Sequence, residues 1–180
     1  LAALRQPDET VDAKPAAPEK SIAVLPFANM STDPENEFFA DGITEEILNA
    51  LAQIPDLRVP GRTSAFSFKG KNVDLRTVGE QLRVRTVLEG SVRRAGNRVR
   101  ITAQLVDALD GYHLWSERYD RDIEDVFAVQ DEIAAAIAAR LKTSLQHDRR
   151  VVAVGRSTDN IEAYEAFLKG RALLHRRGTA

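Results

Sequence analysis

The sequence contains no cysteine and only three histidines among its 180 residues. The lack of cysteine excludes disulfide bonds, thiol nucleophiles and thiolate metal sites, but it does not identify a cellular compartment. Three histidines that stand far apart leave little material for a metal centre. We therefore expect neither a bound metal nor another cofactor.

The sequence also lacks a run of about 20 apolar residues, which is the length that a membrane-spanning helix needs. Its most apolar stretch, residues 133–141, is short, rich in alanine and bounded by charged residues. No positively charged and then apolar leader is present, and the first residue is Leu1 rather than Met. We expect a fragment of a longer protein, with the targeting information elsewhere in that protein.

Neither sign of charge is in excess, since 25 Lys and Arg face 27 Asp and Glu, for a formal net charge of -2. This balance argues against wholesale electrostatic binding to nucleic acid or to an anionic membrane, although a local basic patch stays open. Hydrophobic residues make up 43% and charged residues 29%. These fractions are typical of a globular domain and not of a disordered tail.

Shifts in composition predict the domain organisation. Pro7, Pro15 and Pro18 stand among alanines and charged residues, which indicates a linker over residues 1–20. A second polar stretch predicts another linker over residues 147–159. Residues 21–146 are then the folded domain, and residues 160–180 hold a separate amphipathic helix.

The spacing of apolar residues predicts an α/β fold. We expect strands over residues 21–27, 57–60, 86–94, 98–108 and 112–120, and helices over 39–54, 73–82 and 123–145. Residues 62–72 are predicted to be a polar loop. The order predicts a two-layer domain, with a mixed five-stranded sheet, helices on one face and an extra C-terminal helix over 160–177. The other face of the sheet is then either exposed to solvent or a docking surface.

The sequence lacks the usual signatures of catalysis. No G-x-S-x-G motif is present, and no motif brings His113, His147 or His175 to a nucleophile. The carboxylates within residues 120–125 stand where a helix should begin, and acidic residues there complement the helix dipole. Glu45 and Glu46 are interpreted as a solvated helix face. We predict that the chain is not an enzyme. An enzyme with a catalytic site of unrecognised type is the alternative.

Two groups of polar residues are candidates for binding. Arg98, Arg100 and Gln104 share one side of a predicted strand, beside a hairpin turn that carries more arginines. Facing side chains on paired strands lie about 5 Å apart, so like charges there need an anion or a carboxylate. This surface is either a salt-bridged solvent face or a recognition face for a phosphate, a nucleic acid or an acidic protein. Arg62 and Lys69 precede a predicted helix start, where an anion could bind, but the Walker spacing is missing.

Seven short sequence motifs, in a fixed order, resemble those of a known family. They are SIAVLPF at 21–27, FADGITEE at 39–46, RTS at 62–64 with FKG at 68–70, VLEGSVR at 87–93, LWSERYD at 114–120 and VFAVQDEI at 126–133. Together they look like the TolB-like amino-terminal domain that precedes tetratricopeptide repeats in many bacterial proteins. Residues 160–171 resemble the opening helix of such a repeat array.

The resemblance implies a non-catalytic interaction or sensory module within a larger bacterial signalling or regulatory protein. Such domains commonly follow a class III adenylate cyclase domain, a winged-helix regulator or a protein kinase, often with a membrane helix between. Any cyclase activity would then belong to another part of the parent protein. A protein partner or the adjacent domains of the same chain would be bound, on the cytoplasmic or periplasmic side of a membrane-anchored parent.

A regulatory domain that binds a small molecule, a nucleotide or another anion is the alternative function. For either function the candidate contact residues are Arg62, Lys69, Arg98, Arg100 and Gln104. No residue is predicted to be catalytic, and none is predicted to bind a metal.

Overall fold

The computed structural model describes residues 16–142 and 160–177. The predicted linker over 147–159 therefore lies outside the described residues, as does most of the predicted linker over 1–20. None of the helices in the described part combines the length and the apolarity that crossing a bilayer requires.

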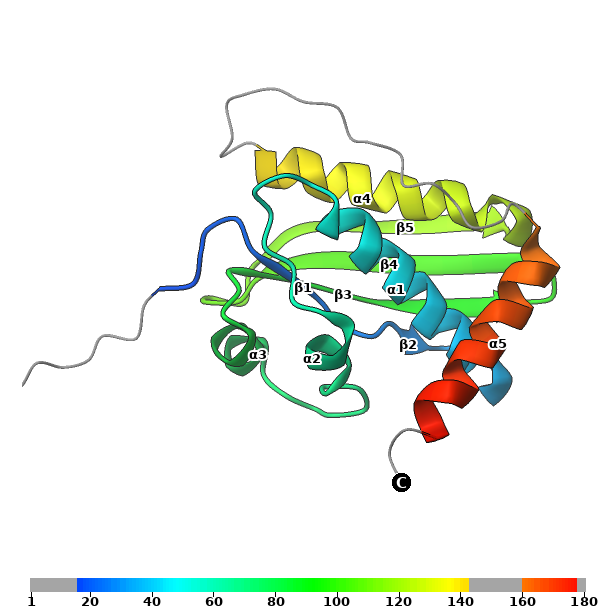
Figure 1. Ribbon diagram of the computed structural model, residues 1–180. Coiled ribbons are helices and arrows are strands. Elements are labelled where there is room, and N and C mark those ends of the chain that lie inside the picture. Colours follow the sequence, from blue (N-terminus) through cyan, green and yellow to red (C-terminus); the bar gives the residue numbers. More distant parts are fainter. Residues whose placement is uncertain (1–15, 143–159, 178–180) are drawn as a thin grey trace, which may run out of the picture.

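A mixed five-stranded sheet forms the framework of the fold (Figure 1). Its strands are β1 (Ile22–Val24), β2 (Ala28–Asn29), β3 (Thr86–Ala95), β4 (Arg98–Asp107) and β5 (His113–Asp122). The order is β1-β3-β4-β5, and β2 also pairs with β3. β1 and β2 run parallel to β3, whereas β3, β4 and β5 form an antiparallel meander. The predicted α/β fold with a mixed five-stranded sheet is confirmed.

One of the five strands lies elsewhere than predicted. Residues 57–60 contribute only an isolated bridge between Ser21 and Arg58, so the strand predicted there is wrong. Pro60 has no N–H to extend the pairing. The remaining strand is β2, which continues along β3 after the chain has left that edge around Pro26. A two-residue strand after a proline carries too little pattern to be predicted.

Two long helices cover one face of the sheet, as predicted, whereas a third, shorter helix packs against the opposite face and not, as predicted, beside them. α1 (Glu37–Ala52) follows a single 3-10 turn, η1 (Pro34–Asn36), and α4 (Val126–Lys142) follows another, η2 (Ile123–Asp125). Figure 1 shows α1 and α4 side by side over the sheet, and the two helices are in contact. The predicted helix over 73–82 is α3 (Leu75–Leu82), which begins where the Asp74 carboxylate accepts a hydrogen bond from the Arg76 N–H.

The loop predicted over residues 62–72 contains a short helix, α2 (Arg62–Phe66), so the prediction is wrong for these five residues. Ala65 is fully buried and the Gly61 carbonyl accepts hydrogen bonds from Ser64 and Ala65. Burial of one side chain thus stabilises a helical turn that the polar composition does not indicate.

The apolar core is divided by the sheet. The larger cluster joins α1 and α4 to the inward side chains of the meander, among them Val99, Ile101, Ala103 and Leu105 of β4. The smaller cluster contains Ala23 and Val87, which alternate with members of the larger cluster along their strands, together with Phe68 and Val78. Because alternate side chains of a strand point to opposite faces, α3 and the Phe68 loop cover part of the other face.

The C-terminal helix α5 (Ile161–Arg177) confirms the helix predicted over 160–177. Figure 1 shows α5 crossing α1 at one end of the sheet. Tyr164 and Leu168 are buried, at 2% and 3% exposure, whereas Phe167 is 50% exposed. Part of the apolar side of this helix is therefore covered by the domain itself.

Candidate functional site

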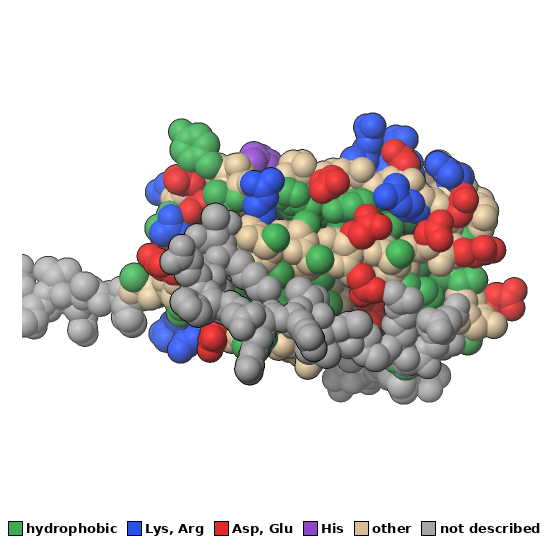
Figure 2. Space-filling view, turned by 90° about the horizontal axis from the view of Figure 1, so that it is seen from above, with side chains coloured by type: hydrophobic (Ala, Val, Ile, Leu, Met, Phe, Trp, Pro, Cys, Tyr) green, Lys and Arg blue, Asp and Glu red, His purple; other side chains and the backbone are tan. Residues whose placement is uncertain are grey.

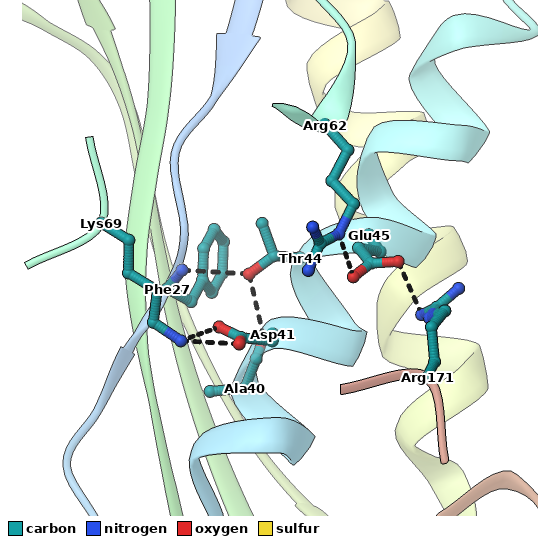
Figure 3. A network of polar contacts seen from close by, with 8 residues as sticks. All are labelled: Phe27, Ala40, Asp41, Thr44, Glu45, Arg62, Lys69 and Arg171. Atoms are coloured by element: carbon teal, nitrogen blue, oxygen red, sulfur yellow. Dashed lines mark hydrogen bonds and ion pairs between the residues drawn. The ribbon is translucent and has the colours of Figure 1, made fainter. Parts of the chain in front are cut away.

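Three carboxylates at every fourth position of α1 organise the polar contacts of the domain. Glu37, Asp41 and Glu45 stand one turn apart, so they share one side of the helix. They meet basic side chains from α2, from the loop after α2 and from α5 (Figure 3). We call this group the α1 charge cluster: Glu37, Asp41, Glu45, Arg62, Lys69 and Arg171.

Glu45 joins two helices to α1. Its Oε1 lies 2.5 Å from Nε of Arg62, and its Oε2 lies 2.8 Å from Nη2 of Arg171. The contact with Arg171 is an ion pair without hydrogen-bond geometry at that nitrogen. The Glu45 side chain is only 9% exposed. The interpretation of Glu45 as a solvated residue is therefore wrong, because α2 and α5 pack over that side of α1.

Lys69 joins the segment after α2 to the start of α1 through ion pairs. Its Nζ lies 2.6 Å from both carboxylate oxygens of Asp41 and 2.8 Å from Oε1 of Glu37. Burial alone would lower the pKa of Lys69, but the hydrogen bonds to these two carboxylates outweigh it and raise the pKa above its ordinary value. Lys69 is therefore held in the charged form.

Thr44 secures the bend between β1 and β2. Its hydroxyl accepts a hydrogen bond from the Phe27 N–H at 3.0 Å and donates to the Ala40 carbonyl at 2.9 Å (Figure 3). Thr44 is fully buried, so the hydroxyl satisfies a backbone donor that the sheet does not pair.

Gly42 and Glu165 belong to the contact between α5 and the domain. A Cβ added to Gly42 would lie 2.3 Å from Cδ1 of Leu168, so this glycine permits the close approach of α5. Tyr164 accepts a hydrogen bond from Gln130 at 3.3 Å, and Glu165 pairs with Arg94 at 2.5 Å. Apolar packing and two ion pairs together hold α5 against α1 and the β3–β4 hairpin.

A groove opens between the loop after α2 and the sheet. Its volume is about 610 Å³, and its lining includes Lys69, Lys71, Glu89, Thr102 and Gln104. Basic, acidic and neutral polar side chains therefore meet in one concave region, which is the usual shape of a ligand site. Lys69 and Gln104 are two of the predicted contact residues.

The side of the meander away from α1 and α4 carries a ladder of charges. Arg98 pairs with Asp122 at 3.2 Å, and Asp120 pairs with Arg100 at 2.7 Å and with Arg118 at 3.5 Å. The hydrogen bond from Arg100 holds the pKa of the Asp120 carboxyl below its ordinary value. We call this surface the open sheet face: Arg93, Arg98, Arg100, Thr102, Gln104, Arg118, Asp120 and Asp122.

The five predicted contact residues fall into separate places. Arg62 and Lys69 lie in the α1 charge cluster, and Arg98 and Arg100 lie on the open sheet face. Gln104 connects the open sheet face to the groove that Lys69 also lines. Their role in binding stays a prediction, and each of the four cations has a carboxylate partner within the domain.

Sequence reasoning missed Glu45 and Gly42 as the contact point for α5. Acidic residues recur every four residues in α1, which is a sequence signal for an acidic stripe along one side of the helix. The partner Arg171 stands near the other end of the sequence, so no local pattern joins the two. Among residues 16–142 and 160–171, no group of three His, Cys, Asp or Glu side chains could hold a metal ion.

Comparison with known proteins identifies relatives in sequence. A family model described as "HilA/YgeH-like transcriptional regulator, second domain" matches residues 18–136. A protein of Rhizobium meliloti (strain 1021) named "Putative adenylate cyclase 3" is 49% identical over 166 residues, which are 92% of this chain and 28% of that protein. The chain thus spans little more than a quarter of this relative.

Two solved structures share the fold. Lipoprotein GNA1162 from Neisseria meningitidis is 20% identical over 71% of this chain and 99% of its own, with a TM-score of 0.50. TolB from Acinetobacter baumannii is 16% identical over 73% of this chain and 30% of its own, with a TM-score of 0.51. At these identities the similarity concerns the fold alone, and it confirms the predicted likeness to TolB at that level. The tetratricopeptide repeat stays a prediction.

Proposed function

Because this chain belongs to the family of HilA/YgeH-like transcriptional regulator second domains, we propose that it is a non-catalytic interaction module of a larger bacterial regulatory or signalling protein. The relative named as an adenylate cyclase suggests one kind of output domain for such a protein. In this proposal any cyclase chemistry resides outside the segment that matches this chain.

The single observation that supports the proposal is that the buried and half-buried polar side chains bind one another or the backbone. In the α1 charge cluster the cations and carboxylates neutralise one another, and Thr44 binds backbone atoms. These groups hold α2, α5 and the β1–β2 bend in place, and none is left to act as a base or nucleophile on a bound substrate. Such an arrangement supports a rigid connector.

We propose that this connector lies between an upstream domain and a downstream repeat array. Residues 1–20 and 147–159 are proposed as linkers around the TolB-like domain of residues 21–146, and residues 160–180 as the start of a tetratricopeptide repeat array. The docking of α5 on Gly42 and Glu45 then joins the first repeat helix directly to the domain. A change in the position of the repeat array would therefore be transmitted to α1 through the contacts of α5 with Gly42 and Glu45.

Two assays test the proposal. The 180-residue chain is incubated with ATP and Mg²⁺ or Mn²⁺, and we expect no cyclic AMP above the buffer control. The Rhizobium relative is then compared with a version that lacks the matching segment, and we expect altered regulation with retained cyclase output. Turnover by the chain alone, with loss of rate when one polar side chain is removed, would contradict the proposal.

A second candidate function is the binding of a small molecule, a nucleotide or another anion. The groove of about 610 Å³ favours it, because Lys69 and Lys71 stand in its lining near the C-terminal end of β1. Thermal unfolding in the presence of millimolar nucleotides and inorganic anions tests this function, since a ligand that binds the folded state raises the midpoint. The absence of any shift, beside a binding protein that responds, would exclude it.

A further inference from the structure

The open sheet face is not covered by a helix at the end that holds the β3–β4 hairpin. Its side chains alternate with the core residues of β4, so they point away from α1 and α4. The strand register places Arg93 opposite Arg100, and Arg100 opposite Asp120. Arg98, Arg100 and Arg118 all have side chains at least 48% exposed.

Cations outnumber carboxylates at this end of the face. Four arginines, Arg93, Arg98, Arg100 and Arg118, stand near only two carboxylates, Asp120 and Asp122. Within the described residues Arg93 reaches no carboxylate, and it donates to the Met30 carbonyl at 3.2 Å. Arg118 makes only a long contact of 3.5 Å. Arg93 thus has no carboxylate partner in the described residues, and Arg118 shares Asp120 with Arg100. Arg93 also faces Arg100 across the paired strands, where like charges are unfavourable.

The neighbouring strand β5 presents a free edge. It is the last strand in the sheet order, so in the described part of the chain no strand pairs with its outer side. An edge strand of ten residues offers a row of backbone donors and acceptors to an extended polypeptide. Figure 2, in which the molecule is seen from above, shows basic and acidic side chains interspersed at both ends of this side of the molecule.

We propose that the open sheet face and the free edge of β5 together dock an acidic, extended segment of a partner protein. The segment would add to the sheet beside β5, and its carboxylates would meet Arg93 and Arg118. This inference rests on the proposed function as an interaction module and names the surface and the chemistry of the partner.

A polypeptide fits this surface better than a nucleic acid does. Binding of single strands relies on exposed aromatic side chains on which bases stack. Trp115 and Tyr119 of β5 are 9% and 5% exposed and lie in the core cluster, so they offer no such platform. A free strand edge, in contrast, is matched only by another peptide backbone.

Binding of a labelled acidic peptide to the 180-residue chain tests the inference. The probe is a fluorescein-labelled peptide of alternating Asp and Thr, and the control peptide has Asn in place of Asp. Arg93→Gln combined with Arg118→Gln should weaken binding on the order of tenfold, because two exposed charges are lost. The control variant, Arg58→Gln with Arg76→Gln, removes the same charge from other exposed arginines and should leave the affinity unchanged.

Further probes separate the possible outcomes. A version of the acidic peptide with N-methyl groups on alternate residues should bind more weakly, because it cannot pair with the β5 edge. Equal weakening by both double variants, no binding of the acidic peptide, or tighter variant-sensitive binding of a labelled oligothymidine would each overturn the inference. Such a failure would leave the proposed function standing if removal of the segment still alters regulation of the longer relative.

Discussion

Two carboxylates in this molecule each hold two guanidinium groups, in very different surroundings. Glu45 pairs with Arg62 and Arg171, and its side chain is 9% exposed. Asp120 pairs with Arg100 and Arg118, and its side chain is 37% exposed. The first group joins three helices, whereas the second spans two neighbouring strands.

This difference shows that burial, and not residue type, decides what an arginine contributes. A paired charge in a dry site becomes costly when its partner is removed, since water cannot replace the lost contact. A paired charge at the surface is screened by water and salt and contributes little to stability. The α1 charge cluster is therefore structural, and the open sheet face is available for binding.

The largest expected effect concerns the packing of α5 beside the α1 charge cluster. Leu168→Ala should lower the free energy of unfolding by about 3 kcal/mol, because it empties a buried site. The matched control is Phe167→Ala on the same helix, whose side chain is half exposed and should contribute less than about 1 kcal/mol. Urea denaturation measures both values, and equal losses would show that α5 is not docked on α1.

Thr44→Val should cost about 2 kcal/mol, because the buried Phe27 N–H then has no acceptor. Thr44→Ser keeps the hydroxyl and is the control, with a smaller loss from the missing methyl group. Both are read from denaturation curves. A Thr44→Val variant as stable as the Ser variant would mean that the hydrogen bond at the β1–β2 bend is not needed.

Gly42→Ala should cost about 1 kcal/mol net, since the strain against Leu168 exceeds the gain in helix propensity. In the Leu168→Ala background the same change should become neutral or stabilising, because the obstructing atoms are gone. Gly61→Ala meets no atom within 4 Å and serves as the control. A cost that persists in the double variant would contradict the contact.

The smallest effect on stability is expected for Arg100→Gln on the open sheet face. Arg100 lowers the pKa of Asp120, so the native pair stabilises the fold only above the ordinary pKa of this carboxyl. That contribution is lost as the pH falls through the lower pKa of the folded state. The variant should raise the pKa of Asp120 in a carboxyl NMR titration and lower the unfolding midpoint at neutral pH only slightly, because the exposed pair is screened by water. An unchanged pKa would show that the pair does not form in solution.

Local patterns predicted the parts of the fold in which neighbouring residues repeat a rule. The alternation of Val99, Ile101, Ala103 and Leu105 with polar residues identified β4 and its buried face. β2 and α2 were missed because two and five residues are too few to establish a period. The partners of Glu45 were missed because an ion pair between residues far apart in sequence depends on the packing of α2 and α5.

The most direct test compares the two shared carboxylates in one experiment. Glu45→Gln and Asp120→Asn are prepared in the 180-residue chain, and their unfolding by urea is measured at neutral pH. We predict a loss of about 2 kcal/mol for Glu45→Gln, which leaves two partly buried arginines without a carboxylate, and no resolvable change for Asp120→Asn. Equal losses, or a greater loss for Asp120→Asn, would contradict the assignment of the α1 charge cluster to structure and of the open sheet face to binding.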